Sequence, residues 1–127
     1  MATRRSIAPL TKGERAYIAK LVDALGRRSF RVKKCDYNAQ RLIINDTARR
    51  LRYWEGEMDC SDFSVPHAWV TINGKIVDLT DDAAARRMRR EKIPGAHESP
   101  NYYGTVISRR LVLRHVMNTN EWGPVKE

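Results

Sequence analysis

Apolar residues recur every three or four positions between residues 11 and 25, the spacing that places side chains on one face of an α-helix. The members of this stripe are Tyr17, Ile18, Leu21, Val22 and Leu25. Residues 11–14, Thr-Lys-Gly-Glu, have the spacing of a capping box, and Gly26 supplies a stop after the stripe. The pattern predicts a helix over residues 11–25, preceded by a loose arm at residues 1–10.

A second helical pattern begins near Cys35 and continues to about Asn45. The apolar positions that follow Cys35 on this stripe are Ala39, Leu42, Ile43 and Ile44. Cys35 is thus expected at the N-terminal end of a helix, where backbone N–H groups have no partner inside the helix. The basic segment before it, residues 27–34, is read as a loop or short strand.

The middle of the chain has the pattern of antiparallel strands. Residues 51–58 mix aromatic and charged side chains in a short run, which favours a strand, and residues 59–66 are expected to form a connection. Asn73-Gly74 is flanked by alternating apolar residues, the strongest short-range signal of a β-hairpin. A hairpin over residues 67–80 is therefore predicted.

Weaker patterns follow the hairpin. Residues 81–92 read as a surface helix, residues 93–100 as a loop, and residues 102–117 as one further strand. The fold class expected from these elements is α+β, with a small antiparallel sheet packed against two or three helices. At 127 residues the chain is expected to form one domain, over residues 11–127.

A two-residue turn fixes which side chains of the hairpin share a face, because directly opposed residues point to the same side. With Asn73 and Gly74 in the turn, Val70 faces Val77. One face then carries His67, Trp69, Thr71, Ile76, Asp78 and Thr80, and the other carries Ala68, Val70, Ile72, Val77 and Leu79. His67 and Asp78 become diagonal neighbours, close enough for the carboxylate to accept a hydrogen bond from the imidazole.

A thiol, an imidazole and a carboxylate in these positions have the composition of a catalytic triad. A thiol becomes a good nucleophile at a helix N-terminus beside an imidazole, so Cys35 would attack, His67 would take the proton and Asp78 would fix the ring. Each residue also has a structural reading: a buried thiol, a structural histidine and an aspartate that caps the next segment. The shared face of His67 and Asp78 favours the catalytic reading for the set.

The charge is +9 and uneven, since residues 1–34 carry ten Lys or Arg against two acidic residues. A basic surface suits nucleic acid or an acidic protein as partner, although it also serves as a solvated face. The candidate contact residues for such a partner are Arg27, Arg28, Arg31, Lys33 and Lys34. No recognised nucleic-acid motif accompanies them.

The chain lacks a run of about 18 apolar residues and a secretory signal, so we expect a cytoplasmic protein that does not enter a membrane. In that compartment two cysteines, Cys35 and Cys60, are expected to remain free thiols rather than a disulfide. Metal binding through these cysteines and His67 lacks paired ligands at short spacing. We assign neither a metal nor another cofactor.

Five short motifs carry a resemblance to known proteins: Cys35 with Asn-Ala at residues 38–39, Tyr-Trp-Glu-Gly at 53–56, Pro-His-Ala-Trp at 66–69, Val-Asp-Leu-Thr at 77–80 and Tyr-Tyr-Gly at 102–104. Together they resemble a group of small uncharacterised bacterial and phage proteins that are similar to the papain-like and transglutaminase-like superfamily. The resemblance covers about residues 35–107. It implies that core, with a nucleophilic cysteine opening a helix and a histidine and an aspartate on neighbouring strands.

By this resemblance Cys35 is the nucleophile, His67 the base and Asp78 the residue that orients it. Glu55, Trp69 and Tyr103 match recurring positions and are candidates for substrate binding. The chain departs from the pattern at Asp36, where an aromatic residue is more usual, and at Leu79, which stands where a proline is expected.

The sequence therefore predicts a Cys-His-Asp thiol hydrolase or acyl transferase that acts on an amide bond of a peptide or protein, by peptide cleavage, deamidation or transamidation. The alternative is a non-enzymatic basic protein on the same fold that docks on nucleic acid or an acidic host protein. The oligomeric state is left open.

Overall fold

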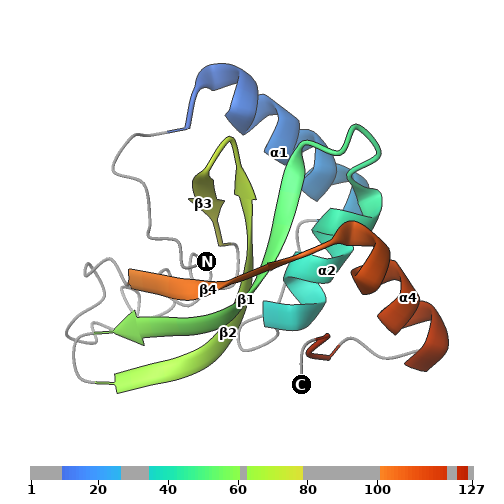
Figure 1. Ribbon diagram of the computed structural model, residues 1–127. Coiled ribbons are helices and arrows are strands. Elements are labelled where there is room, and N and C mark those ends of the chain that lie inside the picture. Colours follow the sequence, from blue (N-terminus) through green and yellow to red (C-terminus); the bar gives the residue numbers. More distant parts are fainter. Residues whose placement is uncertain (1–9, 27–34, 61–62, 79–100, 120–122, 126–127) are drawn as a thin grey trace.

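The structure, a computed structural model, describes residues 10–26, 35–60, 63–78, 101–119 and 123–125. Its described residues form an α+β fold with a four-stranded antiparallel sheet in the order β3-β2-β1-β4 (Figure 1). The strands are β1 (Leu51–Cys60), β2 (Phe63–Ile72), β3 (Lys75–Val77) and β4 (Asn101–Ile107). The helices are α1 (Lys12–Leu25), α2 (Cys35–Asn45) and α4 (Arg109–Thr119). The predicted fold class is confirmed at this level.

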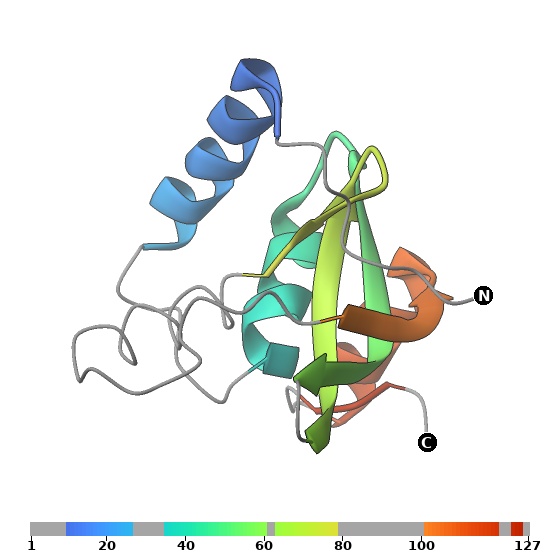
Figure 2. The ribbon, with the colours of Figure 1, turned by 90° about the vertical axis from the view of Figure 1, so that its left-hand side faces the viewer.

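One face of the sheet packs against the helices. Figures 1 and 2 show α2 lying along the strands, and the main hydrophobic core lies between them. The predicted α1 and α2 stripes supply Ile18, Leu21, Val22, Ala39, Leu42 and Ile43, and the sheet supplies Tyr53, Ala68, Val70, Ile72, Val77 and Ile107. Burial of each valine, leucine or isoleucine side chain in this layer is worth about 1.5 to 3 kcal/mol, which makes the layer the main source of stability.

The opposite face carries a second, aromatic cluster. Its buried members are Trp54, Trp69, Ile76 and Tyr102. The indoles of Trp54 and Trp69 are nearly parallel, with ring centroids 6.4 Å apart, and Tyr102 meets Trp69 edge-on at 5.0 Å. Strand alternation therefore separates an aliphatic face under the helices from an aromatic face, as predicted for the hairpin.

The predicted start of α1 is confirmed. Thr11 and Glu14 form the full capping box, in which each side chain accepts a hydrogen bond from the other residue's backbone N–H. The Glu14 carboxylate also accepts hydrogen bonds from Asn73 at 2.6 Å and Lys75 at 2.9 Å. One buried residue thus both caps α1 and fastens it to the β2–β3 turn.

The hairpin register is as predicted. Asn73 and Gly74 form the turn with φ values of 50° and 78°, the left-handed conformation that such a tight turn requires. Ile72 pairs with Lys75, and Val70 with Val77. The side-chain directions on which the candidate triad depends therefore follow from the turn.

Two predictions of strand length are wrong. Residues 59–66 are mostly strand rather than connection, because β1 and β2 continue as a long hairpin through the pair Cys60 and Phe63. Pro66 fits within β2 because β3 pairs with β2 only at residues 70–72, so no β3 residue needs the missing N–H there.

The predicted strand over residues 102–117 is confirmed only in its first part, since β4 ends at Ile107 and α4 follows. Ser108 starts this helix, because its hydroxyl accepts a hydrogen bond from the N–H of Leu111 and its carbonyl accepts one from Val112. Val112 is the fully buried residue of α4. The start signal at Ser108 outweighs the apolar residues that suggested a strand.

The predicted arm up to residue 9, the segment 27–34, the helix over 81–92 and the loop over 93–100 lie outside the described residues. Among the residues that are described, no helix is long and apolar enough to cross a membrane.

Candidate active site

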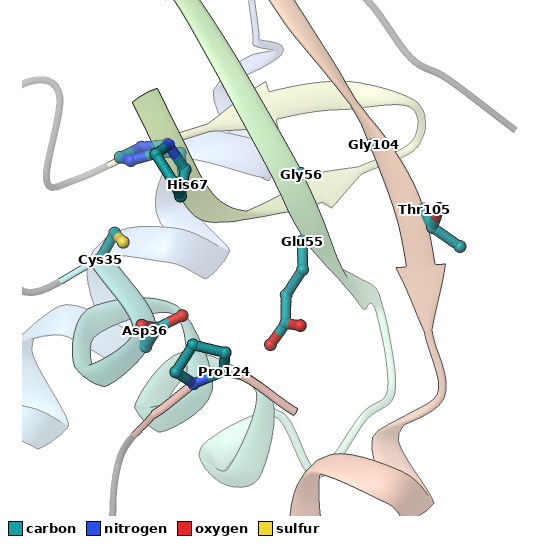
Figure 3. Close-up of a pocket in the computed structure, with 9 residues that line it drawn as sticks. Cys35, Asp36, Glu55, Gly56, His67, Gly104, Thr105 and Pro124 are labelled. Atoms are coloured by element: carbon teal, nitrogen blue, oxygen red, sulfur yellow. The ribbon is translucent and has the colours of Figure 1, made fainter. Parts of the chain in front are cut away.

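Cys35 is the first residue of α2, as predicted, and its thiol takes no part in a disulfide. The side chain is half-buried at the edge of the main core. It lines a pocket of about 410 Å³, a volume within the usual range of ligand-binding pockets. Figure 3 shows Cys35 at the start of α2 with His67 beside it.

His67 and Asp78 are in direct contact, as the hairpin register implied. The ring Nε2 and the carboxylate Oδ2 are 2.5 Å apart, and both side chains are buried. A second hydrogen-bond interaction joins His67 to Cys35. Because Nε2 is taken by Asp78, Nδ1 is the ring nitrogen available to the thiol. The structure thus joins the three candidate residues through one imidazole.

The two interactions decide the charge of the ring. Burial of His67 works toward a lower pKa, but the hydrogen bond to Asp78, then that to Cys35, raises the pKa of the imidazole to about 10. His67 is therefore an imidazolium at neutral pH.

Tyr102 extends this network. Its hydroxyl donates a 2.7 Å hydrogen bond to the same Asp78 oxygen that contacts His67, and the residue is fully buried. The His67 ring lies 6.2 Å from Trp69 and 6.0 Å from Tyr102, centroid to centroid. The buried aromatic cluster therefore packs against the imidazole.

Two carboxylates lie across the pocket from the imidazole. Figure 3 shows Asp36 and Glu55 directed toward the same space, near Pro124. Burial, then the charge of Glu55, raises the pKa of Asp36. Glu55 accepts a 2.6 Å hydrogen bond from the Tyr53 hydroxyl, and burial followed by this contact raises the pKa of Tyr53. Asp36 therefore keeps its proton to a higher pH than an exposed aspartate would.

The side of the pocket formed by β1 and β4 depends on a pair of glycines. Gly56 and Gly104 are register partners, and a Cβ at Gly56 would lie 2.0 Å from the carbonyl oxygen of Tyr103. A Cβ at Gly104 would lie 2.5 Å from the Glu55 carbonyl oxygen and 2.8 Å from the Trp69 ring. Only glycine allows this close approach of the strands beside the candidate residues.

Of the other predicted site residues that the structure describes, one lines the pocket and two do not. Glu55 lines the pocket, whereas Trp69, 1% exposed, is packed behind His67 and does not line it. Tyr103 is 37% exposed on β4, also outside the lining. The basic residues Arg27, Arg28, Arg31, Lys33 and Lys34 lie outside the described residues.

Sequence reasoning assigned no role to several residues of the site. Tyr102 belongs to one of the motifs, but its hydroxyl contact depends on the β1–β4 pairing, which nothing local in the sequence signals. Gln40, Tyr53 and Pro124 were likewise missed. The alternation of β1 was the available signal for Tyr53, because it places Tyr53 on the same face as Glu55.

Within the described part of the chain, no group of three His, Cys, Asp or Glu side chains is arranged to hold a metal ion. No protein-family profile matches the chain, and comparisons with characterised proteins and with solved structures give no match. The geometry of the site is therefore the basis for any assignment.

Proposed function

We propose that this protein is a thiol hydrolase or acyl transferase that acts on an amide bond, with a papain-like or transglutaminase-like arrangement of its core. The observation that carries the proposal is that His67 interacts with both Cys35 and Asp78, and that Cys35 and His67 line a pocket. Enzymes of unrelated folds attack a carbonyl carbon with the same three groups: a nucleophile, a base and a residue that orients the base.

In the proposed reaction the Cys35 thiolate attacks the amide carbonyl, and the His67 imidazolium donates its proton to the leaving amine. The neutral imidazole then removes a proton from water or from an acceptor amine, which attacks the acyl-enzyme and releases the thiolate. The backbone N–H of Cys35, at the start of α2, is one candidate donor to the oxyanion. Asp78 keeps the imidazolium oriented through both steps.

The proposal is tested by the alkylation rate of Cys35 with iodoacetamide as a function of pH, in a Cys60→Ser background. We expect the rate to stay near its plateau below about pH 7, because the imidazolium favours the thiolate. In the His67→Ala variant an ordinary thiol, with a pKa of about 8.5, is only about 0.3% thiolate at pH 6, so the rate there falls steeply.

Asp78→Asn is the companion variant, because it keeps the shape of the side chain and removes its charge. It should also shift the alkylation profile toward higher pH, but by a smaller amount than His67→Ala does. Identical profiles for all three proteins, each folded by circular dichroism, would show that the imidazole does not activate the thiol, and the proposal would fail.

A further inference from the structure

Residues 123–125 are fastened beside the candidate active site through their backbone. The amide of Gln40 donates a 2.7 Å hydrogen bond to the carbonyl of Gly123, and the N–H of Val125 donates one of 2.7 Å to the carboxylate of Glu55. Pro124, between these two contacts, lines the pocket together with Cys35 and His67.

The groups that hold this segment are built into the fold. Gln40 is fully buried on α2 and Glu55 is 8% exposed on β1, and the Tyr53 hydroxyl links them. It accepts a hydrogen bond from Gln40 at 3.0 Å and donates one to Glu55 at 2.6 Å. The donor and the acceptor that face the segment are therefore fixed in position before any peptide binds.

The chemistry of these contacts matches a peptide backbone. An amide N–H donor meets a carbonyl, and a carboxylate meets a backbone N–H two residues further along. Neither hydrogen bond uses a side chain of the bound segment, so another peptide can make both; the Val125 side chain packs separately against the main core. The acceptor is charged, which makes its hydrogen bond stronger than one between neutral groups.

We propose that Gln40 and Glu55 form a peptide-backbone binding site beside Cys35, and that residues 123–125 occupy it in competition with a peptide substrate. This inference rests on the proposed function, because a bound peptide is a substrate only if the protein is the proposed enzyme. The substrate class is then a peptide, recognised through its backbone, rather than a small amide. Glu55 also gains a definite part in substrate binding, as acceptor of a backbone N–H.

The experiment measures binding of a synthetic peptide, acetyl-Gly-Pro-Val-Lys-amide, by isothermal titration calorimetry. Val125→Pro in the full chain removes the N–H that Glu55 accepts and keeps an apolar residue in place. We expect this variant to bind the peptide about tenfold more tightly than the unchanged chain, because one charge-assisted hydrogen bond of the competing segment is lost. A chain that ends at residue 122 should show a larger gain.

Glu55→Ala, combined with Val125→Pro, should lose about tenfold or more of that peptide affinity. Its matched control is Glu57→Ala, which removes the same charge from an exposed position two residues along β1 and should leave binding unchanged. Equal affinity of the unchanged chain, Val125→Pro and the truncated chain, all folded, would overturn the proposal. So would equal loss in the two glutamate variants.

These outcomes are separate from those for the proposed function, because the peptide assay does not require a reactive thiol. Peptide binding that depends on Glu55, together with a Cys35 alkylation profile indifferent to His67, would keep the binding site and reject the enzyme. The reverse pair of results would keep the enzyme and reject the site.

Discussion

The hydroxyl of Tyr102 offers the sharpest test of the network behind His67. Tyr102→Phe removes one oxygen and keeps the ring, so the edge-on contact with Trp69 at 5.0 Å is preserved. The lost interaction is a 2.7 Å hydrogen bond to the buried carboxylate of Asp78. Hydrogen bonds to charged groups contribute about 1.5 to 3 kcal/mol, and Tyr102 is 0% exposed, so water does not replace the hydroxyl. We expect the free energy of unfolding to fall by about 2 kcal/mol.

The assay is urea unfolding followed by tryptophan fluorescence, because Trp54 and Trp69 are buried in the same cluster. Tyr103→Phe is the comparison, since it removes a hydroxyl from the neighbouring residue, which is 37% exposed on the opposite face, and a smaller loss of stability than that of Tyr102→Phe is expected. A double-mutant cycle with Asp78→Asn then isolates the contact. Coupling of about 1 kcal/mol or more is expected, and additive effects of the two substitutions would refute the reasoning.

Three further outcomes follow from single contacts. The hydrogen bond from the backbone of Thr11, then those from Asn73 and Lys75, lower the pKa of Glu14 from 4.5 to about 2. Thermal melting should therefore show stability that is complete above pH 4.5 and declines from there toward pH 2, with a smaller decline in Glu14→Gln. The pKa of His67 is raised from 6.5 to about 10, so its contribution is complete below pH 6.5 and is lost as the pH rises through 10; melting of His67→Gln should lack this alkaline loss. Gly56→Ala should lower stability by about 3 kcal/mol in urea unfolding, because its Cβ would lie 2.0 Å from a carbonyl oxygen, whereas Gly13→Ala, with nothing within 4 Å, should raise stability by about 0.5 kcal/mol.

Local signals in the sequence located the elements that carry the candidate triad. The capping box fixed the start of α1, and the apolar spacing placed Cys35 at the start of α2. The Asn-Gly turn set the register that brings His67 and Asp78 to one face. These features depend on residues a few positions apart, so they can be predicted without knowing the tertiary structure.

Other parts of the fold could not be predicted from short stretches of the sequence. The end of β4 at Ile107 was missed because the serine that starts α4 is a weak signal among apolar residues that also suit a strand. The continuation of β1 and β2 through residues 59–66 depends on pairing across the hairpin, and Pro66 argued against it. At residues 59–66 the pairing with the neighbouring strand outweighed local preference.

The sequence by itself determined the types of residue available for catalysis, the element on which each one lies and the direction in which the hairpin residues point, because helix spacing, capping and turn geometry are local properties. Only the tertiary structure decided that α2 presents Cys35 to His67, that Tyr102 reaches Asp78 across the sheet, and that Gln40 and Glu55 hold residues 123–125. The physical reason is that these contacts join segments far apart in the sequence, and they form only when burial of the two hydrophobic clusters fixes the helices and strands relative to one another.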